Sequence, residues 1–275
     1  KYLEDHKENI NAKMIQDLAE YCDHSTFQNH VLLISHKQIM QYMDTKDIEE
    51  WRKVESRFQS ISFEQNDEDT IHLMGNVMLK EAPIWKNFIC DYKENFKNLL
   101  DQTLDAGFYA TLDKNQANSF LYGIYPLHPI VGQALNILSK KVAQNERTIF
   151  TFLAGDEENS LGTFLRDTNL SKFQFVGIDM LYDYFEDNLS RDKNTQEYQE
   201  WLQTRNSINK LNNKDKNYEI KIKIIKAIGV INIINDYDLI KPDDKILTYI
   251  IDEDKEDIGK AIEELYTNRI IVYLR

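Results

Sequence analysis

The hydrophobic residues of this chain recur mostly at helical spacing. Between Pro129 and Val142 they return every three or four positions, which predicts a long helix with one buried face. A long polar helix is expected around Tyr198 and Trp201. Similar patterns predict helices over residues 1–20, 44–58, 66–78, 84–104, 160–166, 243–251 and 258–265. The apolar, β-branched run 220–232 could form a strand by propensity alone, and the order of the segments that follow it favours a helix. We therefore expect a mainly α protein with minor β structure.

Three short runs have the composition of strands. The uninterrupted apolar run Val31–Ser35 is typical of a buried strand in a parallel sheet, and residues 60–63 and 269–273 predict two more strands. Ligands bind at the carboxyl ends of strands in open α/β sheets, which makes Ser35 and His36 candidate binding residues. The alternative for His36 is an ordinary histidine at a strand end.

A polar segment, Gln144-Asn145-Glu146-Arg147-Thr148, separates the 129–142 helix from the apolar run 149–153. Polar side chains between two buried segments are costly unless they are hydrogen-bonded or reach into a site. This segment is therefore either a satisfied turn between two helices or part of a binding site.

The order of strand VLLISHK, acidic helix EEWRKVESRF and strand SISFE resembles the second half of a P-loop ATPase core of the AAA+ and origin-recognition-like kind. The resemblance implies that Ser35 or His36 lies near the γ-phosphate and that Arg57, near the end of the helix, is catalytic. It also implies that Arg147 reaches the nucleotide from a helical lid, with Asn145 among its local supports. Structural arginines should be ion-paired within the chain, whereas nucleotide-binding arginines should be partly exposed on the side that faces the carboxyl end of the Val31–Ser35 strand.

The opening KYLE and the LHP at residues 127–129 resemble large bacterial ATPases of phage-defence islands, in which the first motif follows Walker B. The Walker B Asp-Glu pair is missing, and none of the glycines begins the Gly-Lys-Ser/Thr end of a Walker A loop. The resemblance therefore implies that ATP and Mg²⁺ belong to an intact parent ATPase. This chain alone is expected to be inactive. Its expected partner is an upstream P-loop core or a neighbouring protomer.

The same resemblance divides the chain into the distal part of the ATPase core (residues 1–65), a helical lid (66–170) and a winged-helix-like domain (171–275). In DNA-binding winged helices the second of the paired helices enters the major groove. Here that helix, around residues 257–266, is acidic, which favours a structural or protein-contact role over DNA binding.

One stretch concentrates positive charge. Its lysines could contact a nucleic-acid backbone or an acidic partner, although such runs are usually solvated loops. They are Lys210, Lys214, Lys216, Lys221, Lys223 and Lys226.

The net charge of −13 argues against coating of nucleic acid by the whole chain. The cysteines Cys22 and Cys90 lack a metal-type spacing, which favours a reducing, cytoplasmic setting, and no apolar run approaches membrane length. Two hypotheses result: the distal part of an ATPase whose phosphate loop lies elsewhere, or a non-catalytic helical protein-interaction module with a winged-helix end.

Overall fold

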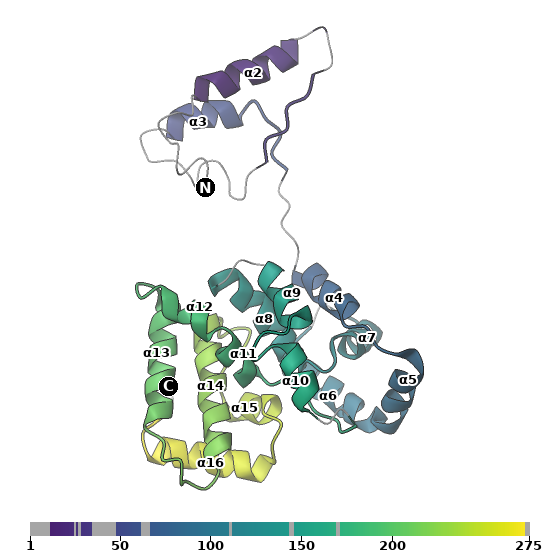
Figure 1. Cartoon of the computed structure of the whole chain (residues 1–275), viewed down its shortest axis with the longest axis vertical. Coiled ribbons are helices and arrows are strands. Elements are labelled where there is room, and N and C mark those ends of the chain that lie inside the picture. The colour runs from purple at the N-terminus through teal and green to yellow at the C-terminus, as the bar shows by residue number, and fades with distance from the viewer. Residues whose placement is uncertain are drawn as a thin grey trace. The chain divides into compact units, whose positions relative to one another are not determined.

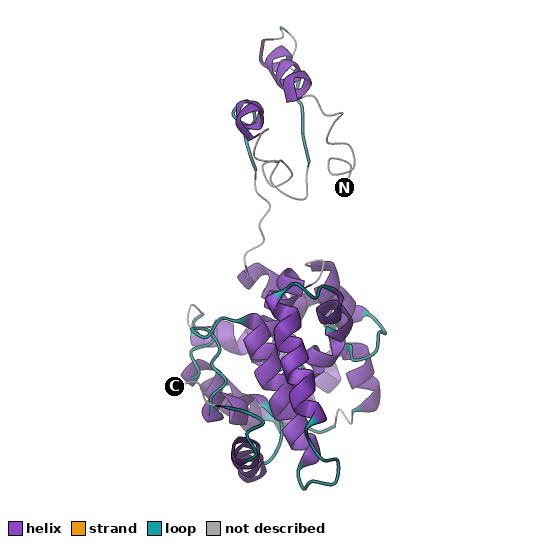
Figure 2. Cartoon of the chain, turned by 90° about the vertical axis from the view of Figure 1, so that its left-hand side faces the viewer, coloured by secondary structure: helices purple, strands orange, loops and turns teal. Residues whose placement is uncertain are grey.

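The protein is described here from a computed structural model, in which residues 12–24, 26, 29–34, 48–61, 67–109, 112–142, 146–168 and 171–272 are placed. The chain forms two compact units, residues 1–64 and residues 65–275, and each is described by itself. The placed residues are mostly helical, and Figure 2 draws no strand among them. The prediction of a mainly α protein is therefore confirmed.

In the first unit, helix α2 (Ala12–His24) packs against helix α3 (Ile48–Glu55). Val54 is fully buried, yet many other large apolar side chains of this unit are exposed to solvent. They are Met14, Leu18, Tyr21, Leu32, Leu33, Ile34 and Ile61. The described part of the first unit therefore has little hydrophobic core of its own.

The predicted strand at Val31–Ser35 is wrong for the residues that are described. Residues 31–34 form no strand, and Leu32 and Ile34 are 79% and 88% exposed. Residues 60 and 61 form no strand either. A buried parallel strand needs a hydrogen-bonded neighbour on each side, and the described residues of the first unit provide none. An apolar run alone did not determine the local structure.

The second unit is built from helices joined by short loops (Figure 1). The only strand-like pairing among its described residues is an isolated parallel bridge between Leu127 and Val176. Its helices are α4 (Asp67–Val77), α5 (Ala82–Asp91), α6 (Lys93–Asp105), α7 (Lys114–Ile124), α8 (Pro129–Val142), α9 (Glu146–Ala154), α10 (Leu161–Asp167), α11 (Ile178–Tyr184), α12 (Glu186–Arg191), α13 (Gln196–Asn209), α14 (Tyr218–Ile234), α15 (Asp244–Ile250) and α16 (Lys255–Thr267).

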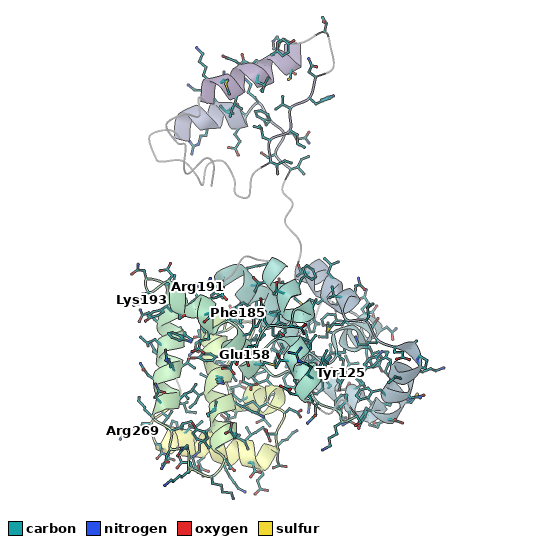
Figure 3. All side chains as sticks on the ribbon, viewed as in Figure 1. Tyr125, Glu158, Phe185, Arg191, Lys193 and Arg269 are labelled. Carbon is teal, nitrogen blue, oxygen red and sulfur yellow. The ribbon has the colours of Figure 1, made fainter. Side chains whose placement is uncertain are left out.

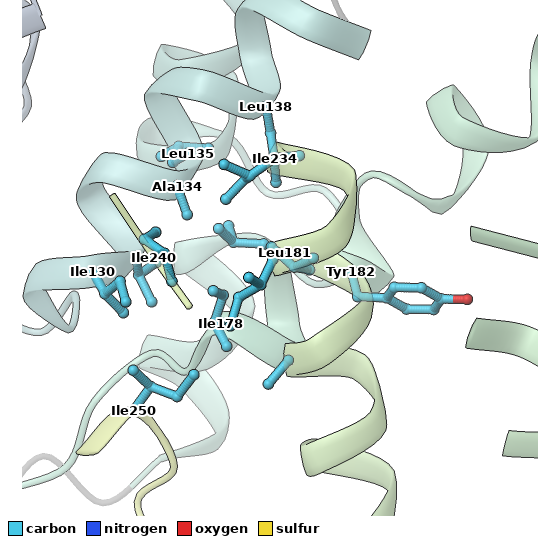
Figure 4. Packing of buried hydrophobic residues seen from close by; sticks show 14 of the residues in the cluster. Ile130, Ala134, Leu135, Leu138, Ile178, Leu181, Tyr182, Ile234, Ile240 and Ile250 are labelled. Atoms are coloured by element: carbon cyan, nitrogen blue, oxygen red, sulfur yellow. The ribbon is translucent and has the colours of Figure 1, made fainter. Parts of the chain in front are cut away.

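One hydrophobic core runs from α4 to α16, with α8 and α14 at its centre. Figure 4 shows Ala134 and Leu138 of α8 directed toward Leu181 of α11 and Ile234 of α14. All four side chains are at most 1% exposed. The predicted 129–142 helix is thus confirmed, with its apolar face buried as expected. The proposed boundary between residues 170 and 171 stays a prediction.

Helix α14 is rich in isoleucine, a residue that also suits strands. The helix predicted over 220–232 is nevertheless confirmed. It is stabilised by packing against α8, α11, α13 and α16, which buries apolar residues on several sides of α14. Its approach to α13 requires a glycine, since a Cβ atom added at Gly229 would lie 2.4 Å from the Oγ1 atom of Thr204.

Two further predictions in this unit are corrected. The single helix expected over 84–104 is divided at Tyr92 into α5 and α6. On either side of this break, Phe88, Tyr92 and Phe96 all contact the ring of Phe173, at centroid distances of 6.3, 5.5 and 4.8 Å. The apolar face expected for one helix is therefore shared by two shorter helices.

The strand predicted at 269–273 is wrong for the described residues 269–272. Helix α16 ends in a Schellman motif, in which the N–H of Ile270 donates to the carbonyl of Leu265 and the N–H of Arg269 donates to that of Tyr266. Arg269 adopts the left-handed conformation, with φ of 54°. The apolar residues after α16 therefore fold back onto the helix end and form no strand.

Candidate functional site

The structure describes only some of the five residues that the sequence indicated for a nucleotide site. Ser35, His36 and Asn145 lie outside the described residues. Arg147 lies in the first turn of α9, but its side chain is not described. Arg57 is described fully, and it belongs to the first unit. The roles of all five stay predictions.

Both the backbone and the side chain of Arg57 are bonded to other residues of the first unit. Its backbone N–H donates to the carbonyl of Val54, the buried residue of α3, at 3.0 Å. At the other end, Nε and Nη2 lie 2.8 and 2.7 Å from the same oxygen, Oε1 of Glu20 on α2. The arginine side chain is still 40% exposed. Arg57 therefore meets the structural criterion, an ion pair within the chain. It is also partly exposed, but residues 31–34 form no strand whose carboxyl end it could face, so the criterion for a nucleotide-binding residue is met only in its exposure.

Glu20 was not among the residues that the sequence indicated. Its Oε1 atom also accepts a hydrogen bond from Nε2 of Gln16, one turn earlier on α2, at 2.9 Å. These donors favour the ionised form, so the hydrogen bonds from Gln16 and then from Arg57 lower the pKa of Glu20 below its usual value. The spacing of Gln16 and Glu20, four residues apart on one helix, is the signal that could have drawn attention to them.

The helix that carries Arg147 is firmly packed. Ile149 and Phe152 of α9 are buried in the core of the second unit, and the preceding helix α8 lies at the centre of that core. Near the end of α8, the Nζ atom of Lys141 donates to the carbonyl of Ile234 at 2.7 Å, which satisfies an otherwise open carbonyl at the end of α14. The backbone that presents Arg147 is thus fixed by two helices.

Three of the lysines in the predicted basic stretch turn inward. Lys221 has a side chain only 4% exposed and pairs with Glu264 at 2.8 Å and with Asp215 at 3.3 Å. Burial alone would lower the pKa of Lys221, but these two carboxylates outweigh it and raise the pKa. Two further pairs join Lys223 to Glu253 and Lys226 to Asp183.

The interpretation of the whole stretch as a solvated loop is therefore wrong for residues 221, 223 and 226. Lys210, Lys214 and Lys216 do lie in an exposed connection between α13 and α14. Among the other surface cations, Figure 3 shows Arg191 and Lys193 near the first end of α13 and Arg269 toward its other end. These labelled cations therefore lie toward opposite ends of α13.

His128 is a buried residue at the start of α8. It is 3% exposed, its ring packs edge-on against Phe175 and Tyr249, and Nδ1 accepts a bond from the N–H of Ile130 at 3.4 Å. Burial lowers the pKa of His128 to about 3, although a backbone hydrogen bond at Tyr249 acts in the opposite direction. The imidazole is therefore neutral at physiological pH and acts as part of the core.

The connection between α4 and α5, together with the first turn of α5, exposes apolar side chains to solvent. Leu79 and Ile84 are 94% and 63% exposed, while Lys80 between them is half-buried. Nζ of Lys80 donates to the carbonyl of Gly123 and lies 5.2 Å from the centre of the Trp85 ring. Burial lowers the pKa of Lys80 to about 8. This connection is an exposed apolar surface on an otherwise well-packed unit.

Within the described ranges, no group of three or more His, Cys, Asp or Glu side chains could hold a metal ion. None of the described helices has the length and apolar character needed to cross a membrane. Comparison of the chain with protein-family models, curated proteins and solved structures found no match.

Proposed function

We propose that this chain is the distal part of a P-loop ATPase, and that residues 1–64 join a nucleotide-binding core which these 275 residues do not contain. The observation that carries the proposal is the exposure of apolar side chains in the first unit, where Val54 is the single fully buried one among the described residues. Burying a large apolar side chain contributes about 1.5–3 kcal/mol. Covering Met14, Leu32 and Ile34 alone would thus stabilise an assembly by roughly 5 kcal/mol or more.

In this proposal Arg57 and Arg147 stabilise negative charge on a transferred phosphoryl group, and Ser35, His36 and Asn145 provide polar contacts. The described geometry of Arg57 fits an anionic ligand. A guanidinium carries five N–H donors, and the two directed at Glu20 leave the others for a phosphate. ATP and Mg²⁺ would supply the phosphoryl group and its counter-charge, held by the core that the chain lacks.

The same proposal implies a partner, a biological setting and a role for the last three helices. The partner is an upstream P-loop core or a neighbouring protomer, and phage defence is the setting that the resemblance implies. A winged-helix-like end would use α14, α15 and α16. Because α16 is acidic and three lysines of α14 are ion-paired, we expect this end to contact protein and not DNA.

A second candidate is a non-catalytic helical protein-interaction module. The exposed Leu79, on the connection between α4 and α5, and Ile84, in the first turn of α5, favour it, because exposed apolar surface often marks a protein contact. This candidate requires no nucleotide and no catalytic role for Arg57.

Calorimetry and ATPase assays separate the two candidates. The 275-residue chain alone should show no micromolar ATP binding, because it lacks the backbone loop that cradles the phosphates. In the full natural protein or complex that contains this chain, Arg57→Ala should lower ATP turnover by about 10³–10⁵-fold with little change in Tm. Arg52→Ala, an exposed arginine on α3, is the matched control. Normal turnover in the Arg57→Ala protein would remove Arg57 from the site.

A further inference from the structure

Arg57, Glu20 and Gln16 form a connected group in the first unit. Gln16 and Glu20 lie on α2, while Arg57 follows α3, so the group joins the two helices of the unit through side chains. All three donor atoms, Nε2 of Gln16 and Nε and Nη2 of Arg57, converge on one oxygen, Oε1 of Glu20. Among the residues that the structure describes, Glu20 is the only ion-pair partner of Arg57.

This arrangement fixes which way the guanidinium faces. The edge formed by Nε and Nη2 is turned toward Glu20, and the backbone of Arg57 is tied to the buried turn at Val54. A long side chain with both ends held loses much of its rotamer freedom before a ligand arrives. The remaining N–H donors are left on the other edge, where a phosphate could be bound in a defined direction.

We infer that Glu20 is a positioning residue: by binding the Nε edge of Arg57, and with Gln16 holding Glu20 in turn, it presents the opposite edge of Arg57 to an anionic phosphoryl group. The inference rests on the proposed function, since it assigns a role to Glu20 only if Arg57 serves a phosphoryl site.

The competing interpretation is that Glu20 neutralises Arg57 and keeps it from a phosphate. Two features favour positioning. Glu20 takes only the Nε edge of the guanidinium, so a phosphate can bind the opposite edge without breaking the ion pair. In addition, Gln16 donates to the same carboxylate oxygen and restricts the direction of the carboxylate. The two interpretations predict opposite changes in turnover.

The experiment uses the full natural protein or complex that contains this chain, with ATP as the substrate. Glu20→Ala should lower kcat by about tenfold and leave KM for ATP nearly unchanged, because the geometry of Arg57 matters most in the transition state. Glu20→Gln keeps an oxygen acceptor and should recover part of that loss. The control is Asp17→Ala, an exposed carboxylate on the same helix, which should leave both constants unchanged.

The outcomes of the two proposals can be told apart. If Arg57→Ala has no effect on turnover, the proposed function fails. If Arg57→Ala abolishes turnover while Glu20→Ala leaves kcat unchanged or raises it, the positioning role fails and the function stands. A separate readout, on the same full natural protein or complex, is the Nε–H resonance of Arg57 in NMR spectra. It should be slowed in exchange with water in the natural sequence and should lose that protection in Glu20→Ala.

Discussion

The two units of this chain differ in how much hydrophobic core each contains. In the second unit, α8, α11 and α14 share a continuous apolar interior, whereas in the described part of the first unit only Val54 is fully buried. Both units are made of amphipathic helices. The difference teaches that helical patterning alone does not provide a core, because a helix is stabilised mainly by the surface it packs against.

Separating the units should give the largest effect. Residues 65–275 alone should keep the helical content and Tm of that unit in the whole chain, because their core is complete. Residues 1–64 alone should be mostly unfolded at 25 °C, because their described residues bury too little apolar surface. Circular dichroism and thermal melts of both pieces are the measurements. A cooperative transition in residues 1–64 would show that this unit needs no partner.

Acidification should weaken the second unit through the buried His128. Unfolded chains protonate histidine near pH 6.5, but His128 in the folded unit does so only at about 3. Between these values the unfolded state binds more protons, so stability is complete above pH 6.5 and falls as the pH falls. Each pH unit removes about 1.4 kcal/mol, and the loss approaches about 5 kcal/mol at pH 3.

Denaturant titrations of residues 65–275 at several pH values test this expectation. His128→Asn is the matched variant, because asparagine can still accept the N–H of Ile130 at the start of α8 but does not titrate. The difference in unfolding free energy between the two proteins should shrink as the pH falls. A constant difference between pH 7 and pH 4 would contradict the assignment of a neutral, buried imidazole.

A pair of glycine substitutions probes the packing of the second unit at smaller scale. Gly229→Ala should destabilise it by about 1–3 kcal/mol, because the new methyl group collides with Thr204 and forces α13 and α14 apart. Gly259→Ala on α16 meets no atom within 4 Å and should stabilise by about 0.5–1 kcal/mol. Urea unfolding midpoints measure both. Equal effects of the two substitutions would mean that the α13–α14 contact is looser than described.

The sequence predicted those parts of the fold that depend on local periodicity. Helices α8 and α16 were expected from their apolar residues, α13 as a long polar helix, and α14 from the order of the segments that follow it, and the structure contains them. The strands were not predictable in the same way, since an apolar run such as residues 31–34 becomes a strand only when a neighbour pairs with it. The break at Tyr92 was not predicted either, because the apolar residues on both sides of it keep helical spacing.

The interaction partners of the candidate site residues could not be predicted from the sequence either. Arg57 could be proposed from its position near the end of a helix, but its partner Glu20 lies 37 residues away. Lys221 looked like one of several solvated lysines, yet Glu264 of α16 neutralises it in the folded unit. Pairings of this kind are set by packing between elements that are distant in sequence, and no local pattern of charges indicates them.

The position of α14 among its neighbours determines how substitutions in this protein combine. Through Lys221, Lys223 and Lys226 it is linked to α16, to the connection between α15 and α16, and to α11, while Gly229 faces α13. A shift of α14 caused by one substitution changes the surroundings of the others. We therefore expect the effects of Gly229→Ala and Lys226→Met on stability to be non-additive in a double-mutant cycle.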